Sequence, residues 1–235
     1  GEGIASLRRL QDRRGAAQPK KDARDVAAAL RGAGFTEVVE RYDLGIQDMR
    51  TTLSAFEDLA KAADWAVVYY AGHGIEVDGR NYLVPVDAQL KRDSDVEDEA
   101  LPLERVLTRV SVARRMQLVI LDACRDNPFA RRMTPSGGLK RSIGARGLAR
   151  FERLPTNLMI ACSAGKGEAA LDGVAGENSP YARALVKYLA EPQLELGIFF
   201  RKVRADVLAA TDGKQRPFED SSLTDVNLFF RQAAK

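Results

Sequence analysis

Three short stretches of the chain are almost continuously apolar: WAVVYYAGHG at 65–74, QLVILDA at 117–123 and NLMIACSA at 157–164. Apolar runs of this length are typical of strands that are buried on both faces of a sheet. Around them, apolar residues recur at helical spacing over four segments: 22–34, 47–63, 181–190 and 196–210. Strands alternating with helices predict an α/β fold with a mostly parallel central sheet and helices on both faces.

Smaller strands are expected between these elements. The β-branched and aromatic residues of 35–42 predict one strand. Residues 75–86 predict a hairpin, because Asp78-Gly79 at its centre is a dipeptide that favours a tight turn. A final edge strand is expected near SLTDVNLFF, 222–230.

Three segments are expected to lack regular strands. The opening GEGIASLRRLQDRRG has no apolar run, so residues 1–20 are predicted to be an irregular N-terminal segment. The acidic stretch 87–104 is predicted to be a surface loop that leads into a short helix near Pro102. The longest irregular segment, 125–153, carries eight Lys or Arg residues against two acids.

Composition limits the classes of function. The chain has 235 residues, 45% of them apolar, and a net charge of +3, which does not by itself favour nucleic-acid or membrane partners. Two cysteines, Cys124 and Cys162, are too few for a disulfide framework or a four-cysteine zinc site. No apolar stretch approaches 18 residues, and no signal peptide opens the chain. A cytoplasmic location is therefore favoured, or export if a signal peptide has been removed.

The single histidine, His73, and Cys124 each follow an apolar run that is predicted to be a buried strand. Since the carboxyl ends of parallel strands meet at one edge of a sheet, we expect the two residues to lie near each other at that edge. A thiol with an imidazole base is the pair that nucleophilic cysteine catalysis requires. The structural alternatives are a small buried hydrophobic residue for Cys124 and a turn residue for His73. Cys162, in the middle of a strand, is interpreted as structural.

Several motifs together carry a resemblance to a known family: YYAGHG, LDACRDNPF, GENSPYARAL, KDARDVAAAL and KQRPFEDSSL. Over roughly residues 20 to 230 the chain resembles the caspase-like cysteine peptidases, and within them the bacterial metacaspase-like (orthocaspase) branch. The resemblance implies a three-layer caspase-like fold with p20-like and p10-like parts in one domain, 21–235. The family opens with an apolar central strand of the VALVIG kind. We expect that strand either to be missing or to be degenerate, with Ile4 to Leu7 as a poor remnant.

The resemblance also assigns roles at the expected active edge. Cys124 corresponds to the nucleophile and His73 to its base, and the backbone N–H groups of Gly74 and Cys124 correspond to the oxyanion hole. Asp122 and Asp22 correspond to acids that line a pocket for a basic residue.

Other interpretations of the acids remain open. Asp172 is a weaker candidate for the wall of the same pocket. The structural alternatives are a helix N-cap for Asp22 and a strand-end carboxylate for Asp122.

No metal or other cofactor is expected to be required. Some metacaspases bind calcium through an acidic loop, and five acids could supply oxygens here: Asp93, Asp95, Glu97, Asp98 and Glu99. Arg131 stands where that family places another acid, which argues against a complete calcium site.

The resemblance predicts a cysteine endopeptidase that acts on peptides or proteins with Arg or Lys before the scissile bond. The alternative is an inactive caspase homologue that serves as an interaction or regulatory module. The basic segment 125–153 is interpreted as a surface loop, with self-cleavage after Arg146 or Arg150 as an alternative. Because this segment lacks interleaved aromatic residues, nucleic acid is not expected as a partner. A membrane is not expected as a partner either. We expect a monomer rather than an oligomer.

Overall fold

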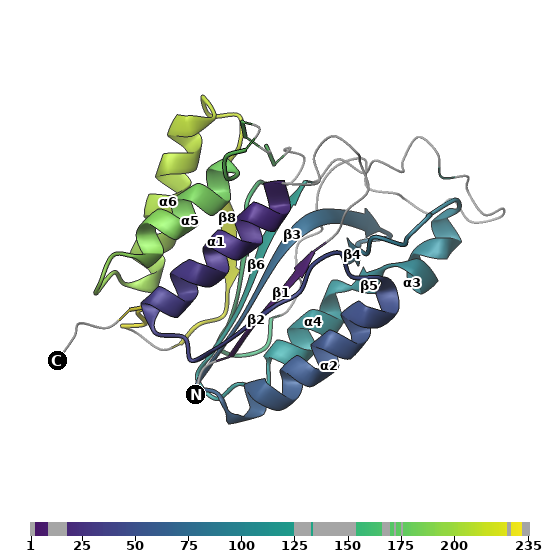
Figure 1. Ribbon diagram of the computed structural model, residues 1–235, viewed down its shortest axis with the longest axis horizontal. Helices are drawn as coiled ribbons and strands as arrows, with labels where there is room; N and C mark the ends of the chain where they lie inside the picture. Colours follow the sequence, from purple (N-terminus) through teal and green to yellow (C-terminus); the bar gives the residue numbers. More distant parts are fainter. Residues whose placement is uncertain are drawn as a thin grey trace.

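A computed structural model describes residues 3–8, 18–124, 133, 154–165, 170–171, 173–174, 176–224 and 227–231. Within these residues one sheet of eight strands forms the centre of the molecule (Figure 1). The strands are β1 (Gly3–Arg8), β2 (Glu37–Glu40), β3 (Trp65–Val77), β4 (Arg80–Val84), β5 (Leu101–Pro102), β6 (Met116–Cys124), β7 (Leu158–Cys162) and β8 (Phe218–Ser221). Six of them lie in the order β2-β1-β3-β6-β7-β8. β4 pairs with the C-terminal part of β3, and β5 pairs with β4.

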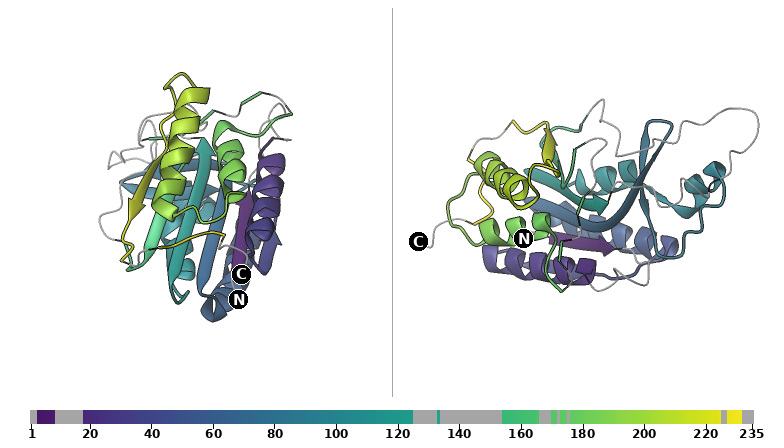
Figure 2. Two further views of the ribbon diagram at one scale, coloured as in Figure 1. Left: turned by 90° about the vertical axis from the view of Figure 1, so that its left-hand side faces the viewer. Right: turned by 90° about the horizontal axis from the view of Figure 1, so that it is seen from above.

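Helices cover both faces of the sheet. They are α1 (Gln18–Ala33), α2 (Ile46–Ala62), α3 (Val96–Glu99), α4 (Leu103–Val110), α5 (Pro180–Leu189) and α6 (Leu196–Ala210), with a 3₁₀ turn at Asp93–Asp95. Figure 1 shows α1, α5 and α6 on one side of the sheet and α2 and α4 on the other. The strands run side by side between these layers (Figure 2). The predicted three-layer α/β fold is confirmed.

Alternation along the central strands explains the two layers. Trp65, Val67 and Tyr69 of β3 belong to the core shared with α1, α5 and α6. Val68 and Tyr70 belong to the core shared with α2 and α4. Successive side chains of a strand point to opposite faces, so a continuous apolar run is what a strand between two helical layers needs.

The first central strand is present, so the expectation that it is missing is wrong, while the alternative of a remnant at Ile4 to Leu7 falls within β1 (Gly3–Arg8). β1 pairs in parallel with β2 from Gly3↔Glu37 to Ser6↔Glu40, and with β3 from Gly3↔Ala66 to Arg8↔Ala71. A strand with a partner on each side can satisfy its backbone groups whatever its intrinsic propensity. The weakly apolar GIASLR therefore forms a central strand because of its neighbours.

Three further predictions differ from the structure. The stretch 87–104 is not wholly a surface loop, because it contains the 3₁₀ turn, α3 and the short strand β5, with Val96 and Leu101 buried. The segment 1–20 is not wholly irregular, because it contains β1 and because α1 begins at Gln18. The edge strand lies just before the expected 222–230, at Phe218–Ser221, where it pairs antiparallel with β7.

The hairpin predicted at 75–86 is confirmed and extends β3 beyond its parallel neighbours. Asp78 and Gly79 both have positive φ, 52° and 78°, as a two-residue type I′ turn requires. Glu76 Oε1 accepts a hydrogen bond from the Gly79 N–H at 2.7 Å. β4 then pairs with β3 from Val77↔Arg80 back to His73↔Val84, so the hairpin reaches His73.

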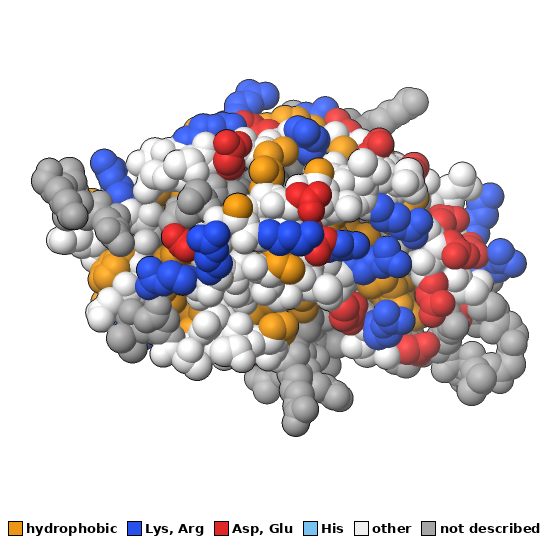
Figure 3. All heavy atoms as spheres, turned by 90° about the horizontal axis from the view of Figure 1, so that it is seen from below, with side chains coloured by type: hydrophobic (Ala, Val, Ile, Leu, Met, Phe, Trp, Pro, Cys, Tyr) orange, Lys and Arg blue, Asp and Glu red, His pale blue; other side chains and the backbone are white. Residues whose placement is uncertain are grey.

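One face of the molecule mixes both signs of charge. Figure 3 shows acidic and basic side chains interspersed over the face seen from below, without a field of one sign. Among the helices that the structure describes, none is long and apolar enough to cross a bilayer.

Candidate active site

His73 and Cys124 lie opposite each other on neighbouring strands. β3 and β6 pair in parallel from Trp65↔Met116 to His73↔Cys124, so the two residues form the last pair of the ladder. His73 is half-buried and Gly74 is buried. The predicted meeting of these residues at the carboxyl edge of the sheet is therefore confirmed for their backbones.

A buried tyrosine supports the backbone at His73. The Tyr70 hydroxyl lies within hydrogen-bond distance of two carbonyl oxygens, that of His73 at 2.9 Å and that of Val84 at 3.2 Å, and its one proton can bond either or be shared between them. Tyr70 itself is fully buried in the core under α2 and α4. A Cβ added at Gly72 would lie 2.6 Å from the Tyr70 hydroxyl, so a glycine there leaves room for this contact.

Asp122 lies at the same edge of the sheet, with its side chain on the face opposite to Tyr70. Its Oδ2 accepts hydrogen bonds from the Tyr69 hydroxyl at 3.1 Å and from the Ser179 hydroxyl at 2.7 Å. The carboxyl group is held between β3 and the start of α5, and only 8% of Asp122 is exposed.

Asp22 approaches the same serine from α1. Its Oδ1 accepts a hydrogen bond from the Ser179 N–H at 3.0 Å, and Asp22 is 3% exposed. The N-cap interpretation of Asp22 is wrong, because α1 begins four residues earlier, at Gln18. Ser179 thus joins the two acids that the sequence proposed as a pair.

A clasp of polar side chains holds α1 to the residues before α5. Lys21 Nζ donates to Asn178 Oδ1 at 3.0 Å and also binds Asp25. Asn178 Nδ2 donates to Asp25 Oδ2 at 2.8 Å. Lys21 and Asp25 lie on the same turn of α1 as Asp22, so their contacts with Asn178 also hold Asp22 close to Ser179.

The two acids affect a neighbouring phenol. Burial raises the pKa of Tyr69 well above 10, and the charges of Asp122 and Asp22 raise it further. Tyr69 is therefore a neutral hydrogen-bond donor to Asp122 throughout the physiological pH range.

Several residues that the sequence singled out lie outside the described residues. They are Asp172, Arg131 and the basic segment 125–153 apart from Met133, with Arg146 and Arg150. The side chain of Cys124 is not described either. Cys162 is buried in β7, as its structural interpretation predicts.

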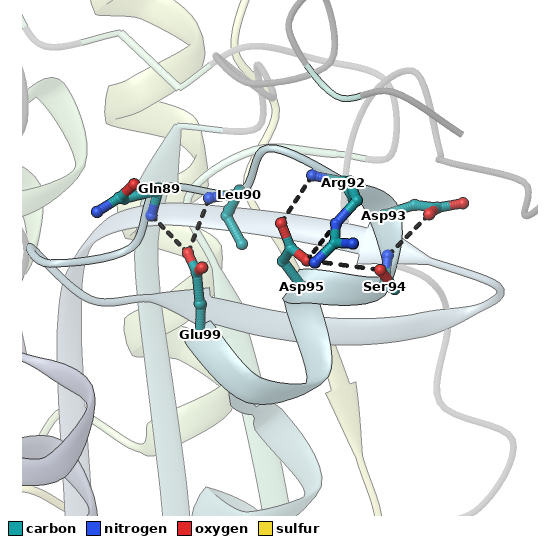
Figure 4. A network of polar contacts seen from close by, with 7 residues as sticks. All are labelled: Gln89, Leu90, Arg92, Asp93, Ser94, Asp95 and Glu99. Carbon is teal, nitrogen blue, oxygen red and sulfur yellow. Dashed lines mark hydrogen bonds and ion pairs between the residues drawn. The ribbon is translucent and has the colours of Figure 1, made fainter. Parts of the chain in front are cut away.

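In the acidic loop, carboxylates bind the loop's own backbone (Figure 4). Glu99 Oε2 accepts from the N–H groups of Gln89 and Leu90, and Asp95 accepts from the N–H and the Nε of Arg92. Leu90 adopts a positive φ of 46°, which the contact with Glu99 helps to hold.

In the described part of the chain, no three His, Cys, Asp or Glu side chains are grouped so as to hold a metal ion. The acids that Figure 4 labels therefore serve the loop itself, and calcium binding stays a prediction of the resemblance.

Sequence reasoning missed Ser179, Tyr69 and Tyr70. A serine before Pro180 is a recognisable helix N-cap, and Ser179 Oγ accepts from the Ala182 N–H at 2.9 Å. Its contacts with two distant acids have no such local signal. The roles of the tyrosines depend on strand register, which the sequence does not specify.

Comparisons with known proteins agree with this architecture. The caspase domain family matches residues 8–228. The chain belongs to this family. The human protein named mucosa-associated lymphoid tissue lymphoma translocation protein 1 is 31% identical over 108 residues, which are 46% of this chain and 13% of that protein. A crystal structure of caspase-1 from Spodoptera frugiperda matches with a TM-score of 0.67 at 18% identity, over 98% of this chain and 89% of that one.

The structural match at 18% identity shows the caspase-like fold. The narrower likeness to the metacaspase branch stays a prediction.

Proposed function

We propose that the protein is a cysteine endopeptidase that hydrolyses peptide bonds after Arg or Lys. The observation that carries the proposal is the pairing of His73 with Cys124 at the edge of the sheet, next to two buried acids. A thiol and an imidazole at one edge suit nucleophilic catalysis, and paired carboxylates suit a cationic substrate side chain.

The reaction would follow the usual course for a cysteine nucleophile. His73 takes the proton from Cys124, and the thiolate attacks the substrate carbonyl to form a tetrahedral oxyanion. The N–H group of Cys124, in the last pair of the β3–β6 ladder, and that of Gly74, one residue beyond His73 of the same pair, would bind that oxyanion. The imidazolium of His73 then protonates the leaving amine, and water releases the acyl group from the sulfur.

The preference for a basic residue rests on charge. Asp22 and Asp122 are both nearly inaccessible to water and converge on Ser179. Two acids in such surroundings attract a guanidinium or ammonium group and repel a carboxylate, so a substrate with Asp before the scissile bond is disfavoured.

A panel of fluorogenic peptides tests the proposal. We expect turnover of peptides that end in Arg or Lys, none of peptides that end in Asp, and complete loss in Cys124→Ala. The matched control is Cys162→Ala, which changes a buried thiol of β7 and should retain turnover if it remains folded. Parallel assays with Ca²⁺ and with a chelator show whether calcium contributes.

Three results would contradict the proposal. They are turnover that persists in Cys124→Ala, cleavage after Asp instead of Arg or Lys, and silence of a protein shown by circular dichroism to be folded.

A further inference from the structure

We infer that Tyr70 is a positioning residue for the oxyanion hole: its hydroxyl holds and polarises the peptide unit that ends in the Gly74 N–H. The inference rests on the proposed function for its catalytic consequence. The structural part concerns a contact between a buried phenol and the backbone beside His73.

The geometry of one peptide unit carries the first step. The carbonyl of His73 and the N–H of Gly74 belong to the same peptide unit, and no cis peptide occurs in the described residues. In a planar trans unit the two groups point in opposite directions. A donor that fixes the His73 carbonyl therefore also fixes the direction of the Gly74 N–H.

Strand pairing gives that direction. Facing residues of an antiparallel ladder alternate between pairs that exchange both backbone hydrogen bonds and pairs that exchange none. Val77 and Arg80 close a two-residue turn and so exchange both, and counting back by twos the His73–Val84 pair does the same. The His73 carbonyl thus points toward β4, and the Gly74 N–H points toward β6, the strand that ends in Cys124.

The Tyr70 hydroxyl adds a second donor to this pair. Its single proton faces the carbonyl oxygens of His73 at 2.9 Å and Val84 at 3.2 Å from the core under α2 and α4, and the nearer acceptor is His73. A carbonyl oxygen has two lone pairs and can accept both the strand bond and the phenol. Hydrogen bonds in a chain strengthen one another, so the added bond at the carbonyl makes the Gly74 N–H a stronger donor.

Space around the contact is restricted. A Cβ at Gly72 would lie 2.6 Å from the Tyr70 hydroxyl and 2.8 Å from the ring carbon that bears it. Gly72→Ala therefore displaces the hydroxyl without removing it, and Tyr70→Phe removes the hydroxyl without moving the ring. The two variants disturb one contact by different routes.

The catalytic test separates oxyanion binding from thiol reactivity. For Tyr70→Phe we expect kcat to fall about three- to tenfold with KM unchanged, which is less than the loss of a whole oxyanion donor. The inhibition constant of a peptidyl aldehyde, whose adduct carries an oxyanion, should rise by a similar factor. Alkylation of Cys124 by iodoacetamide needs no oxyanion hole and should keep its rate. Gly72→Ala should follow the same pattern.

Tyr82→Phe is the matched control, because Tyr82 is a buried tyrosine of the neighbouring strand β4. It should leave kcat, aldehyde binding and alkylation unchanged. If Tyr70→Phe slows alkylation as much as it weakens aldehyde binding, or leaves kcat unchanged, the inference is overturned.

A spectroscopic measurement decides the structural part without any substrate. With glycine labelled by ¹⁵N, the amide proton of Gly74 should shift upfield in Tyr70→Phe and stay in place in Tyr82→Phe. An unmoved Gly74 resonance would overturn the inference even in an active enzyme. An expected shift in a protein without peptidase activity would support the contact and refute the proposed function alone.

Discussion

Ser179 shows how much a single side chain can connect. Its hydroxyl donates to Asp122 and accepts from the Ala182 N–H, while its own N–H donates to Asp22. The residue therefore caps α5 and also holds an acid from β6 and an acid from α1. Buried carboxylates need such partners, because an ionised group without them costs several kcal/mol to bury.

Replacing Ser179 by alanine should lower the free energy of unfolding by about 2 kcal/mol, since a helix cap and a hydrogen bond to a buried acid are both lost. Urea denaturation measures the difference. The control is Glu195→Ala, which removes the side-chain N-cap of α6 without touching a buried acid and should cost about 0.5 kcal/mol. Equal costs for the two variants would show that the contact with Asp122 contributes nothing.

At the level of elements, α2, α5 and α6 could be predicted from helical periodicity, and the long strands β3, β6 and β7 from their continuous apolar runs. α2, α5 and α6 begin and end within one residue of their predicted bounds. β1 could not be predicted in this way, because its sequence is only weakly apolar and its partners on both sides supply its stability.

The residues of the candidate site also fall into two groups: those that sequence motifs identify, and those whose contacts depend on strand pairing. The sequence identified His73, Cys124, Asp22 and Asp122 through motifs, and it placed His73 and Cys124 at one edge. The hydrogen bonds of Tyr69 and Tyr70 depend on which residues face each other across the strands, and that register follows from tertiary pairing.

The clasp between α1 and the residues before α5 should weaken in acid. Burial by itself raises the pKa of Asp25, but hydrogen bonds from Lys21 and Asn178 outweigh it and place the pKa below its usual 3.8. A carboxylate with a lowered pKa stabilises the fold above its unfolded pKa, and this contribution is lost as the pH falls through the folded pKa. Asp25→Asn should therefore cost about 0.5 kcal/mol at pH 7 and close to nothing near pH 2.

Urea denaturation of the wild type and Asp25→Asn at several pH values measures this effect. Asp58→Asn serves as the control, because Asp58 lies on the exposed face of α2 and pairs at 3.0 Å with Lys61 of the same helix. It should show little difference from the wild type at any pH. A cost for Asp25→Asn that persists in acid would contradict the role of the charge.

For the whole molecule, the described residues near the C-terminus close the end of the sheet opposite the candidate site. Phe230 packs against Phe199 with ring centroids 4.7 Å apart and against Trp65 at 5.7 Å. Backbone bonds from Gln193 to Arg231 and from Leu196 to Leu228 hold this segment in place. This C-terminal segment thereby packs against both β3 and α6 and joins them into one hydrophobic core.

Phe230→Ala should lower the free energy of unfolding by about 3 kcal/mol, because it leaves a cavity among aromatic rings. Phe229→Ala is the neighbouring control: Phe229 is only half-buried, and its loss should cost about 1 kcal/mol or less. Thermal and urea denaturation compare the two. A cost for Phe230→Ala no larger than that for Phe229→Ala would show that the segment is not part of the core.

The unbroken register from Trp65↔Met116 to His73↔Cys124 restricts where the chain can change length. One residue inserted within either strand would send every following side chain to the opposite face, so the apolar series would meet the wrong helical layer and His73 would lose its partner across the ladder. The loops between β4 and β6 carry no such rule where they lie outside β5 and α4, because a loop can lengthen while its ends stay in place. Insertions should therefore be tolerated in those loops, while the two strands that carry the histidine and the cysteine must keep their number of residues.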